Sequence, residues 1–179
     1  MEQTFPAYFA TALLALTIIN TSHSQNPDNA PQPMPPVSEY TWDSDEVYDS
    51  SSTIRSNEIN TRAVRDFMSQ YENVSGERWF KLNDGFIVYF TQNEIKIKIA
   101  YNKKGVRLWT HRSYKEDRLP FEIRHLVKSN YYDFSIYHVN EITINRKIAY
   151  FVKMQDKTSW LTVKVEDGEM EVTENYIKS

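Results

Sequence analysis

The chain has 179 residues, of which 40% are hydrophobic and 25% charged, a formal net charge of −3 and no cysteine. This length suits one domain with appendages and is too short for a TIM barrel or a two-domain dehydrogenase. The absence of cysteine excludes disulfides, thiolate zinc sites, iron–sulfur clusters and thiol catalysis. Four glycines leave little material for a glycine-rich phosphate loop, whereas 12 Tyr, 9 Phe and 4 Trp favour an ordered fold with strands.

Residues 1–24 are predicted to be a secretory signal peptide. Residues 7–19 form an uncharged apolar run that is too short for a membrane span, which needs roughly 20 apolar residues. Ser22 and Ser24 put small side chains before the predicted cut. The alternative is a buried N-terminal helix, because the first residues include Glu2 and no Lys or Arg, which also leaves cleavage open. The signal predicts a periplasmic or secreted product without stable membrane insertion.

Residues 25–57 are predicted to be a disordered linker. Five prolines fall between residues 26 and 36, and a Ser-rich acidic stretch follows, so that the segment has a net charge of −5. Such a composition cannot bury enough apolar area to offset chain entropy. Tyr40, Trp42 and Tyr48 interrupt it, and they either dock on the following domain, serve a partner as a short linear motif, or have no role.

Residues 58–179 are predicted to carry the fold. They contain 20 Lys and Arg against 17 Asp and Glu, and a net charge of +3 is not a nucleic-acid-binding signature. Apolar residues recur at helical spacing from Ala63 to Tyr71 and again from Ile123 to Tyr131, after Pro120 at a helix-start position. After each helix the apolar period shortens toward two, which predicts strands. These strands are expected at residues 77–82, 86–90, 94–101, 106–109, 135–144, 148–154, 160–165 and 169–172.

This order predicts two successive units, residues 58–115 and 116–179. The predicted fold class is α+β: a tandem repeat of a helix followed by antiparallel β-strands, with the helices packed on one face of the sheet. The sequence Asp84-Gly85 between apolar runs predicts a type I′ hairpin turn.

Several motifs, taken in order, resemble those of a known family. Residues 73–79 read N-V-x-x-x-x-W, residues 84–86 read D-G-F, residues 101–105 read Y-N-K-K-G where the family has Y-D-x-x-G, and residues 112–120 form a link ending in Leu-Pro. Together they resemble the PepSY-like, β-lactamase-inhibitor-like secreted domains of Bacteroidota, over about two thirds of the chain. The resemblance implies an extracytoplasmic, non-enzymatic tandem α+β module. The second unit departs from the pattern, because it has no Trp at the corresponding strand start, near His138.

No catalytic or metal-binding motif is recognisable in the sequence. After the predicted signal come His111, His125 and His138, which are too far apart for a short-range metal motif. Glu122 and His125 have i, i+3 spacing, but a di-iron site needs a second such pair. There is no G-x-S-x-G elbow. We therefore expect no enzyme activity, metal or cofactor, and keep a small hydrolase as a remote alternative because a triad assembles in space.

A cluster of cations in and after one predicted strand is the candidate partner surface. Lys96 and Lys98 share one strand face, and the turn and next strand add three more cations. The alternative, which we favour, is the solvated face of a half-buried strand whose lysines discourage edge aggregation. The five cations are Lys96, Lys98, Lys103, Lys104 and Arg107.

The expected function is a secreted or periplasmic, non-catalytic binding module of unknown ligand, with an inhibitor-like role among the possibilities. Tyr, Trp and Lys on the solvated sheet face would contact an extracytoplasmic protein or a cell-envelope partner such as peptidoglycan. The alternative is a structural or folding-assistance domain without a small ligand. No nucleic-acid partner is expected, and the oligomeric state is left open.

Overall fold

The computed structural model describes Ile54 and residues 56–179. The chain divides into two units, Met1–Thr41 and Trp42–Ser179, and every described residue belongs to the second. The predicted signal peptide, residues 1–24, and the predicted linker up to residue 53 lie outside the described residues. The domain boundaries therefore stay predictions.

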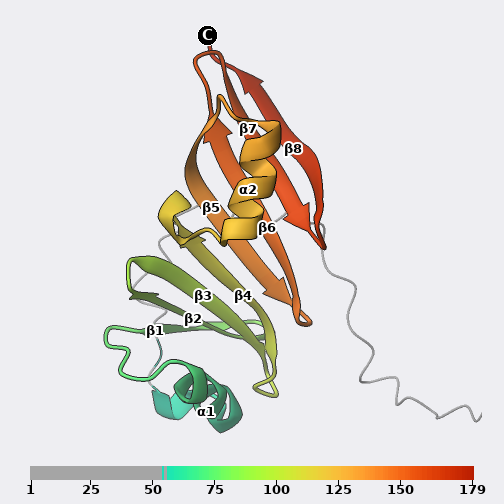
Figure 1. The fold of residues 1–179 in the computed structure, drawn as a ribbon. Coiled ribbons are helices and arrows are strands. Elements are labelled where there is room, and N and C mark those ends of the chain that lie inside the picture. Colours follow the sequence, from blue (N-terminus) through green and yellow to red (C-terminus); the bar gives the residue numbers. More distant parts are fainter. Residues whose placement is uncertain (1–53, 55) are drawn as a thin grey trace, which may run out of the picture. The chain divides into compact units, whose positions relative to one another are not determined.

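Two short helices and eight strands form the described part of the chain (Figure 1). Helix α1 spans Thr61–Gln70 and helix α2 spans Phe121–Asn130, and each follows a short 3-10 turn, η4 at Ser56–Glu58 and η5 at Glu116–Arg118. The strands are β1 Arg78–Leu82, β2 Gly85–Gln92, β3 Ile95–Asn102, β4 Arg107–Tyr114, β5 Ser135–Ile144, β6 Lys147–Gln155, β7 Ser159–Glu166 and β8 Glu169–Ile177.

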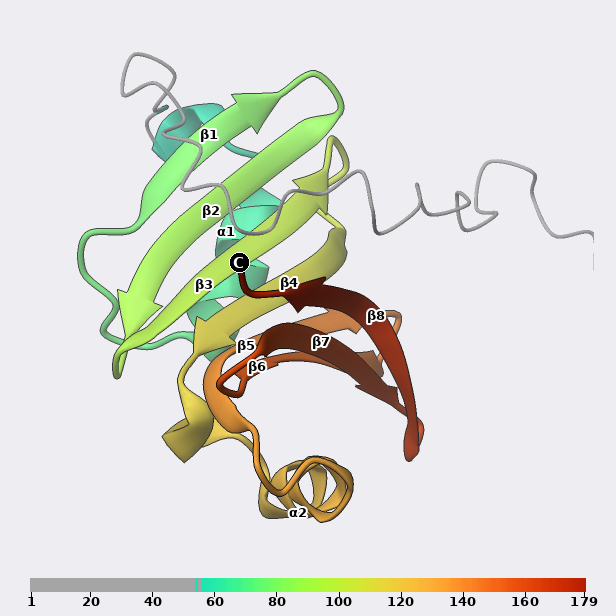
Figure 2. The same ribbon diagram turned by 90° about the horizontal axis from the view of Figure 1, so that it is seen from above.

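The strands form one antiparallel sheet in the order β1-β2-β3-β4-β5-β6-β7-β8. The prediction of a tandem repeat of helix-and-strand units is therefore wrong. Strand β4 pairs with β5 from Trp109↔Ile144 to Tyr114↔Val139, so hydrogen bonding continues across the predicted boundary at residues 115 and 116. The architecture is mostly sheet, with only two ten-residue helices in the described residues. Figure 2 shows the strand direction turning along the sheet, as β-twist requires.

The two faces of the sheet differ in what covers them. Directly opposed residues of antiparallel strands point to the same side, so the pairing register assigns each side chain to a face. The covered face packs with Ala63 and Phe67 of α1 and Val127 of α2 in one hydrophobic core. The opposite face is called the uncovered face, because no described helix packs on it, although side chains at its centre, such as Ile87, His111 and Ile142, are buried. Covered-face core residues include Trp79, Val88, Phe90, Ile97, Ile99, Tyr101, Val139, Val152, Met154, Val163 and Val165.

Local sequence explains where the helices begin. Asn60 is the N-cap of α1, and its Oδ1 accepts a hydrogen bond of 2.9 Å from the Arg62 backbone N–H. Pro120 precedes α2, where its fixed φ suits a helix start, but it provides no side-chain cap. Each helix then buries a narrow apolar stripe on the sheet, as the periodicity predicts.

The turn chemistry differs from the prediction at the first hairpin. Neither Asp84 nor Gly85 has a positive φ, so the predicted type I′ turn there is wrong. Gly85 begins β2 and allows close approach of β3, because a Cβ on it would lie 1.9 Å from the Tyr101 carbonyl oxygen. Consecutive positive φ angles, which type I′ turns need, occur instead at Asn93–Glu94, Asn145–Arg146 and Asp167–Gly168.

Two strands are longer than the sequence predicts. Strand β4 continues to Tyr114, so Arg112 and Ser113 belong to the sheet and not to the predicted link at residues 112–120. Strand β8 continues to Ile177, although its C-terminal half is exposed and begins with the polar residues Thr173, Glu174 and Asn175. Pairing with a neighbouring strand thus extends both strands beyond their apolar pattern.

Candidate functional site

The uncovered face exposes aromatic side chains. Tyr89 of β2 and Trp109 of β4 are half-buried. Trp160 of β7 and Tyr176 of β8 form a cross-strand pair, with 43% and 60% of each residue exposed. The Nζ of Lys178 lies 5.0 Å from the Trp160 ring centroid, at cation–π distance. Exposed Trp and Tyr are the side chains that most often anchor protein interfaces, so this pair is the strongest partner-binding feature of the face.

A polar cluster occupies the centre of the same face. Asn140 Oδ1 lies 2.9 Å from Nε2 of His111 and 3.3 Å from Nε2 of His138, and the latter nitrogen is 3.1 Å from Ser113 Oγ. A catalytic triad would need a carboxylate at the second nitrogen of the same His, whereas Ser113 and Asn140 both contact Nε2. The next acid along the strand, Glu141, points to the covered face. These contacts give the hydrolase alternative no support.

The structure separates the five predicted cations. Lys96 is exposed and Lys98 half-buried on the uncovered face, where Lys98 Nζ lies 6.0 Å from the Tyr89 ring centroid. Lys103 and Lys104 lie in the turn between β3 and β4, and Lys103 Nζ is 3.4 Å from Asp84 Oδ1. The two strand lysines therefore share a face with the exposed aromatics, and the two turn lysines lie at the end of a hairpin.

Arg107 points to the covered face and holds α1 to the sheet. Its Nη2 and Nε donate to Asp66 Oδ2 over 2.6 and 2.9 Å, and its Nη1 donates to Gln70 Oε1 over 2.7 Å. Tyr101 donates its hydroxyl to the same Asp66 oxygen. Burial raises the pKa of Tyr101, and the hydrogen bond to Asp66 adds to the effect. The five cations are thus not one continuous surface, and their role as partner contacts stays a prediction.

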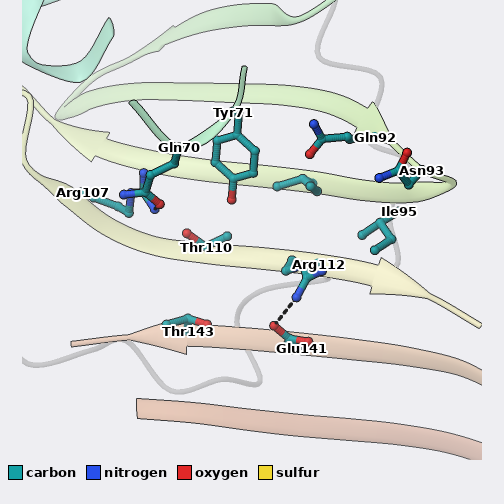
Figure 3. A pocket seen from close by; sticks show the side chains of 11 residues that line it. Gln70, Tyr71, Gln92, Asn93, Ile95, Arg107, Thr110, Arg112, Glu141 and Thr143 are labelled. Carbon is teal, nitrogen blue, oxygen red and sulfur yellow. Dashed lines mark hydrogen bonds and ion pairs between the residues drawn. The ribbon is translucent and has the colours of Figure 1, made fainter. Parts of the chain in front are cut away.

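A cleft on the covered face lies at the C-terminal end of α1, over β3, β4 and β5 (Figure 3). Its volume is about 340 Å³. Gln70 and Tyr71 come from the end of α1, and Arg112 and Glu141 come from β4 and β5. The remaining lining residues are Gln92, Asn93, Ile95, Ile97, Arg107, Thr110 and Thr143.

A partly buried ion pair forms the floor of this cleft. Arg112 Nη1 donates to Glu141 Oε1 over 2.9 Å, and the Tyr114 hydroxyl donates to Glu141 Oε2 over 2.5 Å. The Glu141 side chain is 9% exposed and that of Arg112 is 37% exposed. Burial, and then the hydrogen bond to Glu141, raise the pKa of Tyr114 far above its usual range. Burial also raises the pKa of Tyr71, while the positive charges of Arg107 and Arg112 oppose the shift.

Among the cleft residues, the sequence singles out Arg107 but gives no role to Arg112 or Glu141. The predicted link at residues 112–120 includes Arg112, which the structure places in β4. Glu141 lies within the predicted strand at residues 135–144, but its partner Arg112 is 29 residues away in the chain. Only the pairing register of β4 and β5 brings the two charges together, and that register cannot be predicted from a single sequence.

The described residues contain no group of three or more His, Asp or Glu side chains placed to hold a metal ion. The predicted i, i+3 pair of Glu122 and His125 lies on α2, where both residues are exposed and His125 stacks on Phe121. Among the helices that the structure describes, none has the length and apolar character of a membrane span.

Comparisons with known proteins find similarity in structure but not in sequence. No protein-family model matches the sequence. No curated protein matches it either.

The fold is similar to those of solved Bacteroides proteins. A crystal structure of a DUF2874 family protein from Bacteroides ovatus is 14% identical over 66% of this chain and 87% of that chain, with a TM-score of 0.51. A protein from Bacteroides eggerthii proposed to be periplasmic is 10% identical over 66% of this chain and 88% of that chain, with a TM-score of 0.50. A BLIP-like protein from Bacteroides fragilis is 11% identical over 65% of this chain and 85% of that chain, with a TM-score of 0.49.

These similarities concern the fold alone. They agree with the Bacteroidota part of the resemblance seen in the sequence and do not confirm its PepSY-like part. At such identities, function has to be argued from the surfaces of this chain.

Proposed function

We propose that this chain is a periplasmic or secreted, non-catalytic binding module whose uncovered face binds an extracytoplasmic protein. The observation that carries the proposal is the exposed pair Trp160 and Tyr176, on a sheet face that no described helix covers. Residues 1–24 would act as the export signal and residues 25–57 as a linker to the domain at residues 58–179. An inhibitor-like role is one form of this proposal.

Several features of the face support a protein partner. The exposed pair lies on β7 and β8, and a partner there would bury two large aromatic side chains, which are typical hot-spot residues. Lys96 and Lys98 lie on β3, while Glu171 and Glu174 lie on β8, where Lys164 pairs with Glu171, so the face carries charges of both signs at defined positions. Opposite charges at known places on one surface fix the orientation of a partner more than they add affinity.

The test compares capture by the full chain and by two variants. The protein is immobilised, and periplasmic and culture-supernatant extracts of the source cells are passed over it. We expect a saturable partner that binds the wild type, and the double variant Trp160→Ala, Tyr176→Ala should lose at least about tenfold in affinity, as expected for hot-spot residues. The matched control is Phe121→Ala, which removes an exposed aromatic from α2.

The control separates a specific face from general stickiness. Equal loss in the Phe121→Ala variant would show non-specific apolar capture, and unchanged binding in the double variant would place the partner elsewhere. If no saturable partner is captured, the binding-module proposal fails in favour of a structural or folding-assistance role.

A further inference from the structure

Arg112 carries a hydrogen-bonding edge that no described residue occupies. Among the described residues, Nη1 is its one nitrogen that donates a hydrogen bond, to Glu141 Oε1. The Nε and Nη2 groups form the side-on edge of a guanidinium, and two parallel N–H groups on one edge match the two oxygens of a carboxylate. Arg112 lines the cleft, its side chain is 37% exposed, and its Cζ lies 5.8 Å from the Tyr114 ring centroid, so the guanidinium is held in place at the wall of the cleft.

Arg107, the other guanidinium of the cleft, is in the opposite state. Its Nε and Nη2 are taken by Asp66, and its Nη1 donates to Gln70. Arg107 therefore lines the cleft in a fixed position, and the Asp66 carboxylate largely neutralises its charge. Only Arg112 among the cations of the lining offers a complete edge.

Glu141 does not block an anion at that edge. Each of its oxygens already accepts a hydrogen bond, one from Arg112 and one from Tyr114, and its side chain is nearly buried. Because Nη1 and the Nε–Nη2 edge lie on different sides of the guanidinium, a second carboxylate would meet Arg112 away from Glu141. Arg107 is paired with Asp66 and Arg112 with Glu141, so these four charges balance, and the attraction for an anion rests on the two N–H groups of the Arg112 edge.

Hydroxyl groups and apolar side chains complete the cleft. Thr110 and Thr143 oppose each other on β4 and β5, one step along the same face from Arg112 and Glu141. The Tyr71 hydroxyl, which makes no hydrogen bond to a described residue, points toward β4 (Figure 3). Ile95 and Ile97 of β3 line the other side and are buried. A cleft of this size has room for one carboxylate and one small apolar group, with polar contacts on one side only.

We propose that the cleft binds a carboxylate joined to a small aliphatic group, with the carboxylate on the Nε–Nη2 edge of Arg112 and the aliphatic group against Ile95 and Ile97. A free acid of amino-acid size and the C-terminal residue of a peptide share this chemistry. The site lies on the face opposite the proposed protein-binding surface and does not depend on it.

The test is an NMR titration of the full chain with N-acetyl-leucine as the probe. We expect saturable shifts of the Arg112 side-chain Nε–H and of the backbone amides of β3, β4 and the end of α1. N-acetyl-leucinamide has nearly the same shape without the charge, and it should bind at least about tenfold more weakly, because hydrogen bonds to a charged group are lost. A hexapeptide ending in leucine, with either a free or an amidated C-terminus, then distinguishes a peptide terminus from a small free acid as the ligand. Tighter binding of the free form than of the amidated form assigns a chain terminus. Equal binding of the two forms assigns the small acid.

Two variants assign the contact to the guanidinium edge. Arg112→Lys keeps the charge and removes the paired donors, and it should weaken N-acetyl-leucine binding about tenfold. Arg124→Lys is the matched control on α2, outside the cleft, and should change nothing. If Arg112→Lys loses its fold, Tyr71→Phe replaces it, with an expected loss of about threefold for one hydroxyl.

The proposal is overturned by any of three results: no saturable shift up to high millimolar probe, equal binding of the acid and the amide, or unchanged binding in the folded Arg112→Lys protein. Equal binding of the amide would indicate a site for neutral polar ligands.

Discussion

Helices α1 and α2 have the same length and pack on the same face of one sheet, yet they are attached in different ways. In α1, Phe67 makes edge-to-face contacts with Trp79 and Phe90, at ring centroid distances of 5.5 and 5.2 Å. Asp66 on the same helix is paired with Arg107 of β4. In α2 the one fully buried side chain is Val127, and Phe121 at its start is 73% exposed.

The difference shows that similar elements need not have similar local stability. An aromatic contact, a partly buried ion pair and an N-cap all hold α1, so its attachment has several independent contributions. The attachment of α2 depends mostly on a short aliphatic stripe, in which Ile123 and Leu126 are only partly buried. We therefore expect the sheet beneath α1 to respond strongly to single substitutions and α2 to open locally at lower cost.

The largest expected effect is from Phe67→Ala. Removing a buried aromatic ring leaves a cavity, and the substitution should lower the free energy of unfolding by about 3–5 kcal/mol. The matched change in α2, Val127→Ala, removes two methyl groups and should cost about 1.5–2.5 kcal/mol. Urea denaturation followed by circular dichroism measures both. Equal losses would contradict the unequal attachment of the two helices.

A smaller effect is expected at the turn that approaches α1. Gly105 has a φ of +72°, and a Cβ there would lie 2.6 Å from Asn60 Oδ1 and 2.8 Å from the Ala63 backbone nitrogen. Gly105→Ala therefore combines backbone strain with a steric clash, and it should lower the free energy of unfolding by about 2 kcal/mol or more.

Gly168 supplies the matched control in the other half of the sheet. It has a φ of +82° and nothing within 4 Å of its Cβ position, so Gly168→Ala carries the backbone strain alone, about 1 kcal/mol. Thermal unfolding of the two variants measures the difference. If both substitutions lower the free energy of unfolding equally, the close contact of Gly105 with α1 does not contribute to the loss of stability.

Alkaline pH should destabilise the protein through two buried tyrosines. Burial and a hydrogen bond to a carboxylate raise the pKa of Tyr101 and of Tyr114 in the folded state. Below pH 10 both are neutral in the folded and unfolded chain, and above it only the unfolded chain loses their protons. Stability should therefore be constant toward neutral pH and fall as pH rises above 10, by up to about 1.4 kcal/mol per pH unit for each tyrosine.

Unfolding free energies measured from pH 8 to 11 test the slope. Tyr101→Phe and Tyr114→Phe should each be less stable at neutral pH, because a hydrogen bond is lost, and should each show a shallower alkaline decline. An unchanged slope in both variants would assign the decline to other groups.

How far the sequence predicts the fold depends on the range of the interaction. The stripe of Ala63 and Phe67 and the alternation of Ile95, Ile97 and Ile99 are local patterns, and the structure has a helix and a strand there. The joining of β4 to β5 is not local, because the pairing of Tyr114 with Val139 spans the whole of α2. The tandem-repeat prediction was wrong at this point, since periodicity cannot show that one sheet continues across a connection.

The candidate sites also divide into features that local patterns predict and features that depend on long-range pairing. The strand face shared by Lys96 and Lys98 follows from the pleat alone, and the structure has both on one face. The cleft could not be predicted, because Arg112 meets Glu141 through strand pairing and meets Tyr71 through the docking of α1. Closeness in the sequence groups Arg107 with the lysines, but the irregular register between β3 and β4 at Ala100/Tyr101 places it on the covered face.

The smallest expected effect concerns the N-caps of the two helices. Asn60→Ala removes the hydrogen bond to the Arg62 N–H and the one that Asn60 Nδ2 donates to the Lys103 carbonyl, and it should cost about 1 kcal/mol. Pro120→Ala removes no cap bond from α2, and its cost should stay near 0.5 kcal/mol, roughly the entropic advantage of proline in the unfolded chain. Hydrogen exchange of the first-turn amides separates the two cases, because Asn60→Ala should lower protection in α1 while Pro120→Ala leaves α2 protection nearly unchanged. A large loss of protection in α2 would mean that Pro120 holds that helix as firmly as Asn60 holds α1, and the contrast between the two attachments would then be confined to their buried faces.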